Sequence, residues 1–234
     1  MRDTFYRSGR SLVGALAATN YKLDIDRHAL VPSGAKIIAP NHPTTTDPFL
    51  ITRLLDEPMT ILIHDTVFRV PVLGQYLSAA GHIRVVPGNG IAALSAAMRK
   101  LEQGRTVTIF PEGGISPANG LKEPRTGVAR LALATGAPVI PVGIYLDRSR
   151  IRLIETTVDG EPELIRWYRR GPYYITVGKP MVFHGDAEDR AFVNRVATQI
   201  MQNIAMLAWE SEQRLARRPQ RKPYSFARRL QFQR

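Results

Sequence analysis

The sequence predicts a single-domain α/β fold, in which a mixed sheet of about seven strands is flanked by helices. Segments with strand patterns alternate with segments of helical periodicity along most of the chain, and this order is typical of α/β proteins. A length of 234 residues suits one domain with a sizeable core and would be cramped for two. A hydrophobic fraction of 44% with 22% charged residues indicates a globular chain.

The expected strands are short segments that either alternate in polarity or are continuously apolar. They span residues 21–26, 36–39, 59–64, 81–86, 106–110, 138–146, 150–157 and 173–177. The first alternates and suits a half-exposed strand, whereas the second suits a buried central one. The last two segments are expected to continue the same sheet.

The expected helices are the segments with apolar residues three or four positions apart. They span residues 2–18, 47–55, 68–80, 91–101, 125–135 and 186–216. Gly104 and Gly136 follow two of them, as glycine often follows a helix C-terminus. Asp186 with Asp189 resembles the capped start of the last helix.

The net charge of +12 predicts an anionic partner, which could be nucleic acid, a membrane surface or a phosphorylated substrate. The C-terminus is especially basic, because eight Lys or Arg residues and no acidic residue follow Glu212. No apolar run approaches the ~20 residues that cross a bilayer. We expect the protein to lie on a membrane, with residues 2–18 either packed on the domain or lying in the lipid interface.

Composition also restricts the possible chemistry. The chain has no cysteine, which excludes disulfides, thiolate metal sites and cysteine nucleophiles. Its five histidines are scattered without metal-ligand spacing, so we predict no metal site.

Residues 39–50 join a predicted buried strand to a helix through a turn that holds His42 and Asp47. In an open α/β sheet, reactive side chains gather beyond the carboxyl ends of the strands. A His and an Asp across a tight turn can meet there as a general base, the carboxylate fixing the imidazole tautomer. The alternative is that Asp47 only caps the helix and His42 is a hydrogen-bonded loop residue.

A second strand ends in the acidic, glycine-bearing turn Phe110-Pro111-Glu112-Gly113. Asn-His, four residues and Asp, followed about sixty residues later by Phe-Pro-Glu-Gly, resembles the glycerolipid acyltransferase family, which includes lysophosphatidate acyltransferases. Gly81-His82-Ile83 and residues 137–142 continue this resemblance, which covers roughly residues 35 to 146 with its four blocks in the family's order.

The resemblance implies an O-acyltransferase in which His42 deprotonates an acceptor hydroxyl and Asp47 orients the imidazole. The hydroxyl oxygen would attack a thioester directly, without an acyl-enzyme, and no Gly-x-Ser-x-Gly motif supplies a serine nucleophile. Glu112 would hold the acceptor or the loop, unless it is merely satisfied by backbone N–H groups. Backbone N–H groups at Gly113 and Gly114 would face developing charge or a phosphate. No cofactor is expected, and acyl-CoA or acyl carrier protein is the implied acyl donor.

Two positions depart from the family's pattern, because Pro87 and Ile115 stand where the family usually has arginines. Those arginines are the expected ligands of a phosphate-bearing acceptor. Arg84, Lys122 and Arg125 are the other basic candidates for acceptor binding, although a regular strand would place Arg84 on the opposite face. We therefore expect a lysolipid or hydroxylated lipid other than lysophosphatidate, unless one of these three residues supplies the charge.

Two other classes of function remain open at this stage. Residues 88–93 have the Gly-x-Gly-x-x-Ala outline of a dinucleotide-binding oxidoreductase, with Glu112 about twenty residues later. Pro87 and the position in mid-chain count against that alternative. The other is a non-enzymatic, basic lipid- or nucleic-acid-binding protein, but no recognised nucleic-acid module precedes the basic tail.

The acyltransferase interpretation divides the chain at residue 216. Residues 1–216 form the acyltransferase domain, with an N-terminal helix at 2–18, a catalytic core at 20–185 and a C-terminal helix at 186–216. Residues 217–234 form a basic tail. The expected partners are an anionic membrane surface, a lipid acceptor and the acyl donor, without nucleic acid. The expected location is the cytoplasmic face of a membrane, with peripheral or monotopic attachment.

Overall fold

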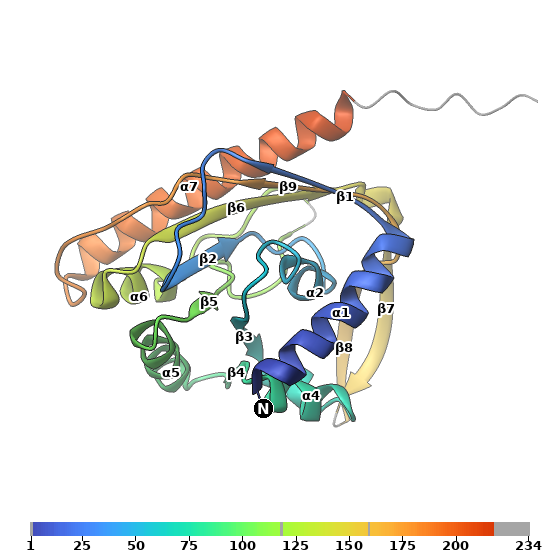
Figure 1. Ribbon diagram of the computed structural model, residues 1–234, viewed down its shortest axis with the longest axis horizontal. Coiled ribbons are helices and arrows are strands. Elements are labelled where there is room, and N and C mark those ends of the chain that lie inside the picture. The colour runs from blue at the N-terminus through green and yellow to red at the C-terminus, as the bar shows by residue number, and fades with distance from the viewer. Residues whose placement is uncertain (1, 118, 159, 218–234) are drawn as a thin grey trace, which may run out of the picture.

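The computed structural model describes residues 2–117, 119–158 and 160–217, and it confirms the predicted α/β fold (Figure 1). A seven-stranded mixed sheet has the order β1-β9-β6-β2-β5-β3-β4. Its strands are β1 (Tyr21–Arg27), β2 (Lys36–Pro40), β3 (Met59–His64), β4 (Ile83–Val85), β5 (Thr106–Thr108), β6 (Val139–Leu146) and β9 (Gly171–Val177).

Strand β2 lies at the centre of the sheet. It pairs in parallel with β5 on one side and β6 on the other, and β3 and β4 continue the parallel part. Strand β9 is antiparallel to β6, and β1 is parallel to β9. All five residues of β2 are buried, as expected of a strand covered on both faces and paired on both edges.

Helices cover both faces of the sheet, so that alternate residues of β2 enter different cores. Ile37 and Ala39 pack with α5, α6 and α7, whereas Ile38 packs with α1 and α2. The helices are α1 (Arg2–Asn20), α2 (Asp47–Ile51), α3 (Asp65–Arg69), α4 (Leu73–Ala80), α5 (Gly90–Glu102), α6 (Gly127–Thr135) and α7 (Arg190–Ala216).

Helix α7 lies across β6 and β9, as Figure 1 shows. It begins at Arg190, four residues later than predicted, and its N-cap is Asp189 of the predicted Asp186–Asp189 pair, which accepts hydrogen bonds from the N–H groups of Ala191 and Phe192. Its closest approach to the sheet is at Gly143 of β6. A Cβ there would lie 2.1 Å from the backbone of Leu207 and Ala208, so glycine is what permits this contact.

Two predicted helices differ from those in the structure. The segment 68–80 forms α4 only from Leu73, after a break at Val72, whose φ of 66° is rare for a β-branched residue. Pro71 precedes this break and cannot supply a helical N–H. The helix that starts at Asp47 ends at Ile51 rather than near residue 55.

The prediction that residues 150–157 extend the main sheet was wrong. They form β7 (Ile151–Val158), which pairs only with β8 (Glu161–Tyr168) in a separate antiparallel hairpin. Strand β8 was not predicted. The hairpin extends away from the main sheet (Figure 1) and is hydrogen-bonded to the turn that follows β2, and we call it the β7–β8 hairpin.

The predicted domain limits stay predictions. The N-terminal and C-terminal helices are present as α1 and α7. The basic tail falls almost entirely on residues 218–234, which lie outside the described residues.

Burial of His82 makes stability depend on pH. The imidazole Nδ1 accepts the N–H of Ile61 at 3.2 Å, and burial lowers the pKa of His82 from 6.5 to about 4. Between these values the unfolded chain binds a proton that the folded chain does not. The free energy of unfolding should therefore decrease as the pH is lowered from about 6.5 to about 4, by up to about 3 kcal/mol. His82→Asn should flatten this dependence in urea titrations between pH 4.5 and 6.5.

The exposed His184 offers a matched control. His184→Asn should keep the wild-type slope of unfolding free energy against pH. If His82→Asn also keeps it, acid destabilisation arises elsewhere.

Candidate active site

Asn41 anchors the chain immediately before His42. Its side-chain amide donates to the carbonyl of Ile144 at 3.0 Å, and its Oδ1 accepts the N–H of Ile144 at 2.6 Å. The Asn41 N–H also donates to Val142 at 3.3 Å. These contacts extend the attachment of β2 to β6 by one residue beyond the strand, so the direction in which the chain enters the turn is fixed.

Asp47 is completely buried and accepts four hydrogen bonds. Oδ2 accepts the N–H of Thr44 at 2.7 Å and faces Nδ1 of His42 at 3.0 Å. Oδ1 accepts the hydroxyls of Thr44 and Tyr173, each at 2.7 Å. A buried carboxylate needs such partners, because its desolvation otherwise costs several kcal/mol. Asp47 is the first residue of α2 and not its N-cap, which is Thr46.

The imidazole of His42 is held from two directions. Its ring stacks on Phe110 with centroids 4.1 Å apart, and Nδ1 faces the Asp47 carboxylate. A carboxylate can only accept a hydrogen bond, so Nδ1 carries the proton and Nε2 is left with the lone pair. The side chain is 15% exposed, and Nε2 is therefore the basic nitrogen available to a substrate.

Tyr173 of β9 completes the buried cluster from a distant part of the chain. Burial, followed by the nearby Asp47 charge and the hydrogen bond to it, raises the pKa of Tyr173 well above 10. The phenol therefore stays protonated and donates to Asp47 over the whole physiological range. This keeps Oδ1 occupied while Oδ2 faces His42.

Glu112 joins the second motif to the first. Its Oε1 accepts the His42 N–H at 2.9 Å and the Ser116 hydroxyl at 2.6 Å, and its Oε2 accepts the Lys122 N–H at 2.9 Å. The N–H of Ser116 donates in turn to the His42 carbonyl at 2.7 Å. These contacts make Glu112 a brace between the two loops, and its predicted contact with an acceptor stays a prediction.

Basic side chains cover the two glycines of the second motif. A Cβ on Gly113, whose φ is 63°, would lie 2.3 Å from Nε of Arg125, and one on Gly114 would lie 3.2 Å from Nζ of Lys122. Glycine at 113 is thus favoured by its left-handed backbone, and a side chain there would also have to displace that of Arg125. The structure brings both predicted basic residues to the loop.

Arg84, the third basic candidate, is not brought to this loop. It lies on the edge strand β4, where Nη1 is 3.3 Å from the buried Asp65 and the guanidinium stacks on the Phe68 ring. Its described contacts are therefore those of a residue that packs α3 against the sheet.

Five residues of the site were not singled out from the sequence: Asn41, Thr44, Ser116, Tyr173 and Arg166, whose guanidinium donates to the Ser116 carbonyl. Most of their contacts join residues far apart in sequence, such as the 126 positions between Asp47 and Tyr173. Asn41, Thr44 and Ser116 lie in or beside a motif, but the motif does not reveal the partners of their side chains.

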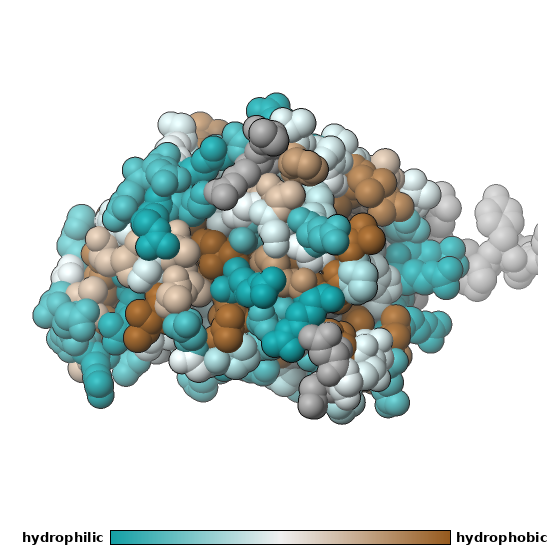
Figure 2. Space-filling view, turned by 90° about the horizontal axis from the view of Figure 1, so that it is seen from below, coloured by the Kyte–Doolittle hydropathy of each residue, from teal (hydrophilic) through white to brown (hydrophobic). Residues whose placement is uncertain are grey.

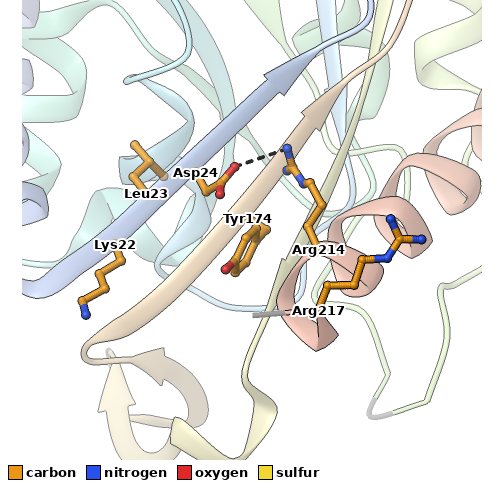
Figure 3. A pocket seen from close by; sticks show the side chains of 6 residues that line it. All are labelled: Lys22, Leu23, Asp24, Tyr174, Arg214 and Arg217. Atoms are coloured by element: carbon orange, nitrogen blue, oxygen red, sulfur yellow. Dashed lines mark ion pairs between the residues drawn. The ribbon is translucent and has the colours of Figure 1, made fainter. Parts of the chain in front are cut away.

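Two hollows on the surface lie away from this cluster. One of about 560 Å³ lies between β1, β9 and the end of α7, where Arg214 points toward Asp24 beside Tyr174 (Figure 3). Another of about 470 Å³ is lined by residues including Lys36 and Glu57. In the described ranges no group of three or more His, Asp or Glu side chains is placed to hold a metal.

The fold and these contacts define an α/β protein with a carboxylate-oriented histidine beside a glycine-bearing loop. A family model described as Acyltransferase matches residues 23–145, which is more than half of the chain. The chain therefore belongs to this acyltransferase family.

Curated relatives have related names. A 1-acyl-sn-glycerol-3-phosphate acyltransferase of Borreliella burgdorferi is 30% identical over 47% of this chain and 45% of its own. The protein with the same name in Escherichia coli is 25% identical over 51% of each chain. A lyso-ornithine lipid O-acyltransferase of Pseudomonas aeruginosa is 29% identical over 68% of this chain and 63% of its own. The chain spans about half the length of the first two.

A solved structure supports the fold. The 1-acyl-sn-glycerophosphate (LPA) acyltransferase PlsC of Thermotoga maritima superposes with a TM-score of 0.58, covering 86% of this chain and 78% of that one. At 19% identity this likeness is one of fold.

The brace formed by Glu112 can be tested by one isosteric change. Glu112→Gln keeps the shape but turns one acceptor into a donor, which leaves at least one of its three donors unpaired. The free energy of unfolding should fall by about 1–3 kcal/mol, and amide exchange at Ser116 and Lys122 should accelerate. Exposed Glu123 is the control, and Glu123→Gln should change neither. Wild-type exchange in Glu112→Gln would contradict the bracing role.

Proposed function

We propose that this chain is a membrane-associated O-acyltransferase. It moves a fatty acyl group from acyl-CoA or acyl carrier protein to a hydroxyl of a lysophospholipid or related lipid. The observation that carries the proposal is His42 with Nδ1 held by buried Asp47, which leaves Nε2 as a base. Family membership and the relatives' names support the same reaction.

The proposed transfer is direct. Nε2 of His42 takes the proton of the acceptor hydroxyl as its oxygen attacks the thioester carbonyl. The C–S bond breaks, and the thiolate takes the proton from the imidazolium to leave as a thiol. Asp47 stabilises the imidazolium meanwhile. Backbone N–H groups of the glycine-bearing loop are the candidates for stabilising the carbonyl oxygen as it becomes negative.

Helix α1 is proposed as one contact with the membrane. Tyr6 and Ala17 are buried against the domain, whereas Phe5, Leu12 and Leu16 are exposed. These three share one face of the helix by their spacing, so α1 both packs on the domain and presents an apolar stripe. No helix in the described part of the chain is long and apolar enough to cross a bilayer.

The two alternatives drawn from the sequence are less well supported. The dinucleotide alternative needs Glu112 free for a ribose, but both of its oxygens are occupied within the site. The glycines of the dinucleotide motif follow β4, which lies at the edge of the sheet. The family match also disfavours a basic protein without catalytic activity.

Removal of the base should abolish the reaction. His42→Ala is expected to lower kcat by about 10²–10⁴-fold without unfolding the protein. Asp47→Asn should also remove most of the activity, because an amide in that position can donate a hydrogen bond to Nδ1 and favour the wrong tautomer. The assay is mass-spectrometric detection of acylated product from acyl-CoA and a panel of lysolipids. His184→Ala is the control and should match wild type, whereas near-wild-type turnover by His42→Ala would disprove the mechanism.

The basic tail should strengthen binding to anionic membranes. Removal of residues 217–234 deletes seven Lys or Arg residues, each contributing roughly 1 kcal/mol near an anionic surface. Co-sedimentation with phosphatidylglycerol vesicles should weaken strongly and lose much of its salt dependence. A full-length variant with these seven residues changed to Gln should behave like the deletion. Unchanged sedimentation of both would assign the tail another role.

A further inference from the structure

The β7–β8 hairpin is fixed directly to the catalytic turn. The N–H of Thr45 donates to the Arg166 carbonyl at 2.9 Å, and the Arg166 N–H donates to the Thr45 hydroxyl at 3.2 Å. Two residues further along β8, the Tyr168 N–H donates to the Thr46 hydroxyl at 3.0 Å. The backbone at position 166 is therefore held three residues from His42.

The side chain of Arg166 reaches the second loop. Its Nη1 donates to the carbonyl of Ser116 at 2.6 Å, and Ser116 is itself bonded to the His42 carbonyl. This guanidinium thus lies one residue from Ile115, where the family's pattern has an arginine. Within the ranges that the structure describes, no carboxylate pairs with Arg166, and its other guanidinium N–H groups have no protein partner.

Two further cations lie on the same loop. Arg125 covers Gly113 and Lys122 approaches Gly114, and no carboxylate pairs with either in the described chain. The acid beneath them, Glu112, already accepts three hydrogen bonds. Positive charges gathered in this way repel one another, and an anion placed among them would relieve that repulsion.

The hairpin places apolar side chains beside Arg166. Leu153 is its direct cross-strand partner, and Leu164 is two positions away on β8, so all three share one face. Leu153 is 64% exposed and Leu164 is 51% exposed. A guanidinium flanked by exposed leucines suits an amphiphile, with an anionic group next to a hydrocarbon chain. The underside of the molecule, where the hairpin ends, shows separate hydrophobic patches among hydrophilic ones (Figure 2).

We propose that Arg166 binds the anionic group of the acceptor lysolipid, while Leu153 and Leu164 contact the adjoining hydrocarbon. Arg166 supplies the charge that position 115 lacks, and Lys122 and Arg125 line the same anion site. This inference rests on the proposed acyltransferase function. It also removes the basis of the expectation, drawn from Pro87 and Ile115 alone, that the acceptor is other than lysophosphatidate. The anion is a phosphate or a carboxylate, either of which a guanidinium can bind through two hydrogen bonds.

The test compares acceptors that differ in charge. Purified variants are assayed with 1-acylglycerol 3-phosphate, with 1-acylglycerol bearing the same chain, and with a lysolipid that has a carboxylate headgroup. Arg166→Gln should lower kcat/KM for the anionic acceptor that wild type prefers by about tenfold or more, mainly through KM. The value for uncharged 1-acylglycerol should change by less than about threefold. Arg166→Lys should be intermediate.

Two variants separate binding from a merely structural role. Arg152→Gln is the matched control, because Arg152 faces Trp167 on the other side of the hairpin, and it should match wild type. Leu153→Glu leaves the Arg166–Ser116 hydrogen bond in place and puts a carboxylate beside the guanidinium. It should weaken use of the anionic acceptors selectively. Equal losses for charged and uncharged acceptors in both Arg166→Gln and Leu153→Glu would overturn the proposal and leave Arg166 as a loop anchor.

A binding measurement keeps this inference distinct from the proposed function. In His42→Ala protein, Arg166→Gln should raise the calorimetric Kd for 1-acylglycerol 3-phosphate or the carboxylate lysolipid by about tenfold. An unchanged Kd for both overturns the Arg166 assignment. Wild-type protein that binds these lipids through Arg166 but transfers no acyl group would instead refute the acyltransferase function alone.

Discussion

The site depends on one buried carboxylate. Asp47 has no exposed surface and takes part in four hydrogen bonds, with the His42 ring, with the N–H and hydroxyl of Thr44 in the same turn, and with Tyr173 of strand β9. Because leaving any of these groups unpaired would cost energy, the turn has one stable geometry. The Nδ1–H tautomer of His42 follows from that geometry and does not require a substrate to induce it.

The second constraint is the adjacency of β2 and β5. Their parallel pairing brings the ends of two motifs together although about seventy residues separate His42 from Glu112. Glu112 then binds the His42 backbone, while the loop that follows carries glycines open to basic side chains. His42, the glycine-bearing loop and the basic side chains on it therefore form one unit. The β7–β8 hairpin adds Arg166 to this unit from outside the region that the family model matches.

The sequence predicted what local patterns encode. The strand leading to His42, the strand leading to Glu112 and a capped helix start near Asp186 and Asp189 could be predicted because they depend on short runs of residues, although the cap proved to be Asp189 and the helix begins at Arg190. The hairpin could not be assigned, since nothing local to residues 150–157 distinguishes a strand of the main sheet from one that pairs only with its neighbour. Tyr173 and Arg166 were missed for another reason: their roles lie in side-chain contacts between distant segments. Arg84 illustrates the converse, because a basic residue near a motif proved to contact Asp65 and Phe68.

The central claim is that Asp47 leaves Nε2 of His42 as the free base, and nitrogen-15 NMR of histidine-labelled protein tests it most directly. The His42 signals would be assigned by comparison with His42→Ala, under conditions where the ring is neutral. The account predicts a protonated Nδ1 and an unprotonated Nε2 with a pyridine-type shift. A neutral ring protonated at Nε2 would contradict it, because that nitrogen could not then accept the hydroxyl proton.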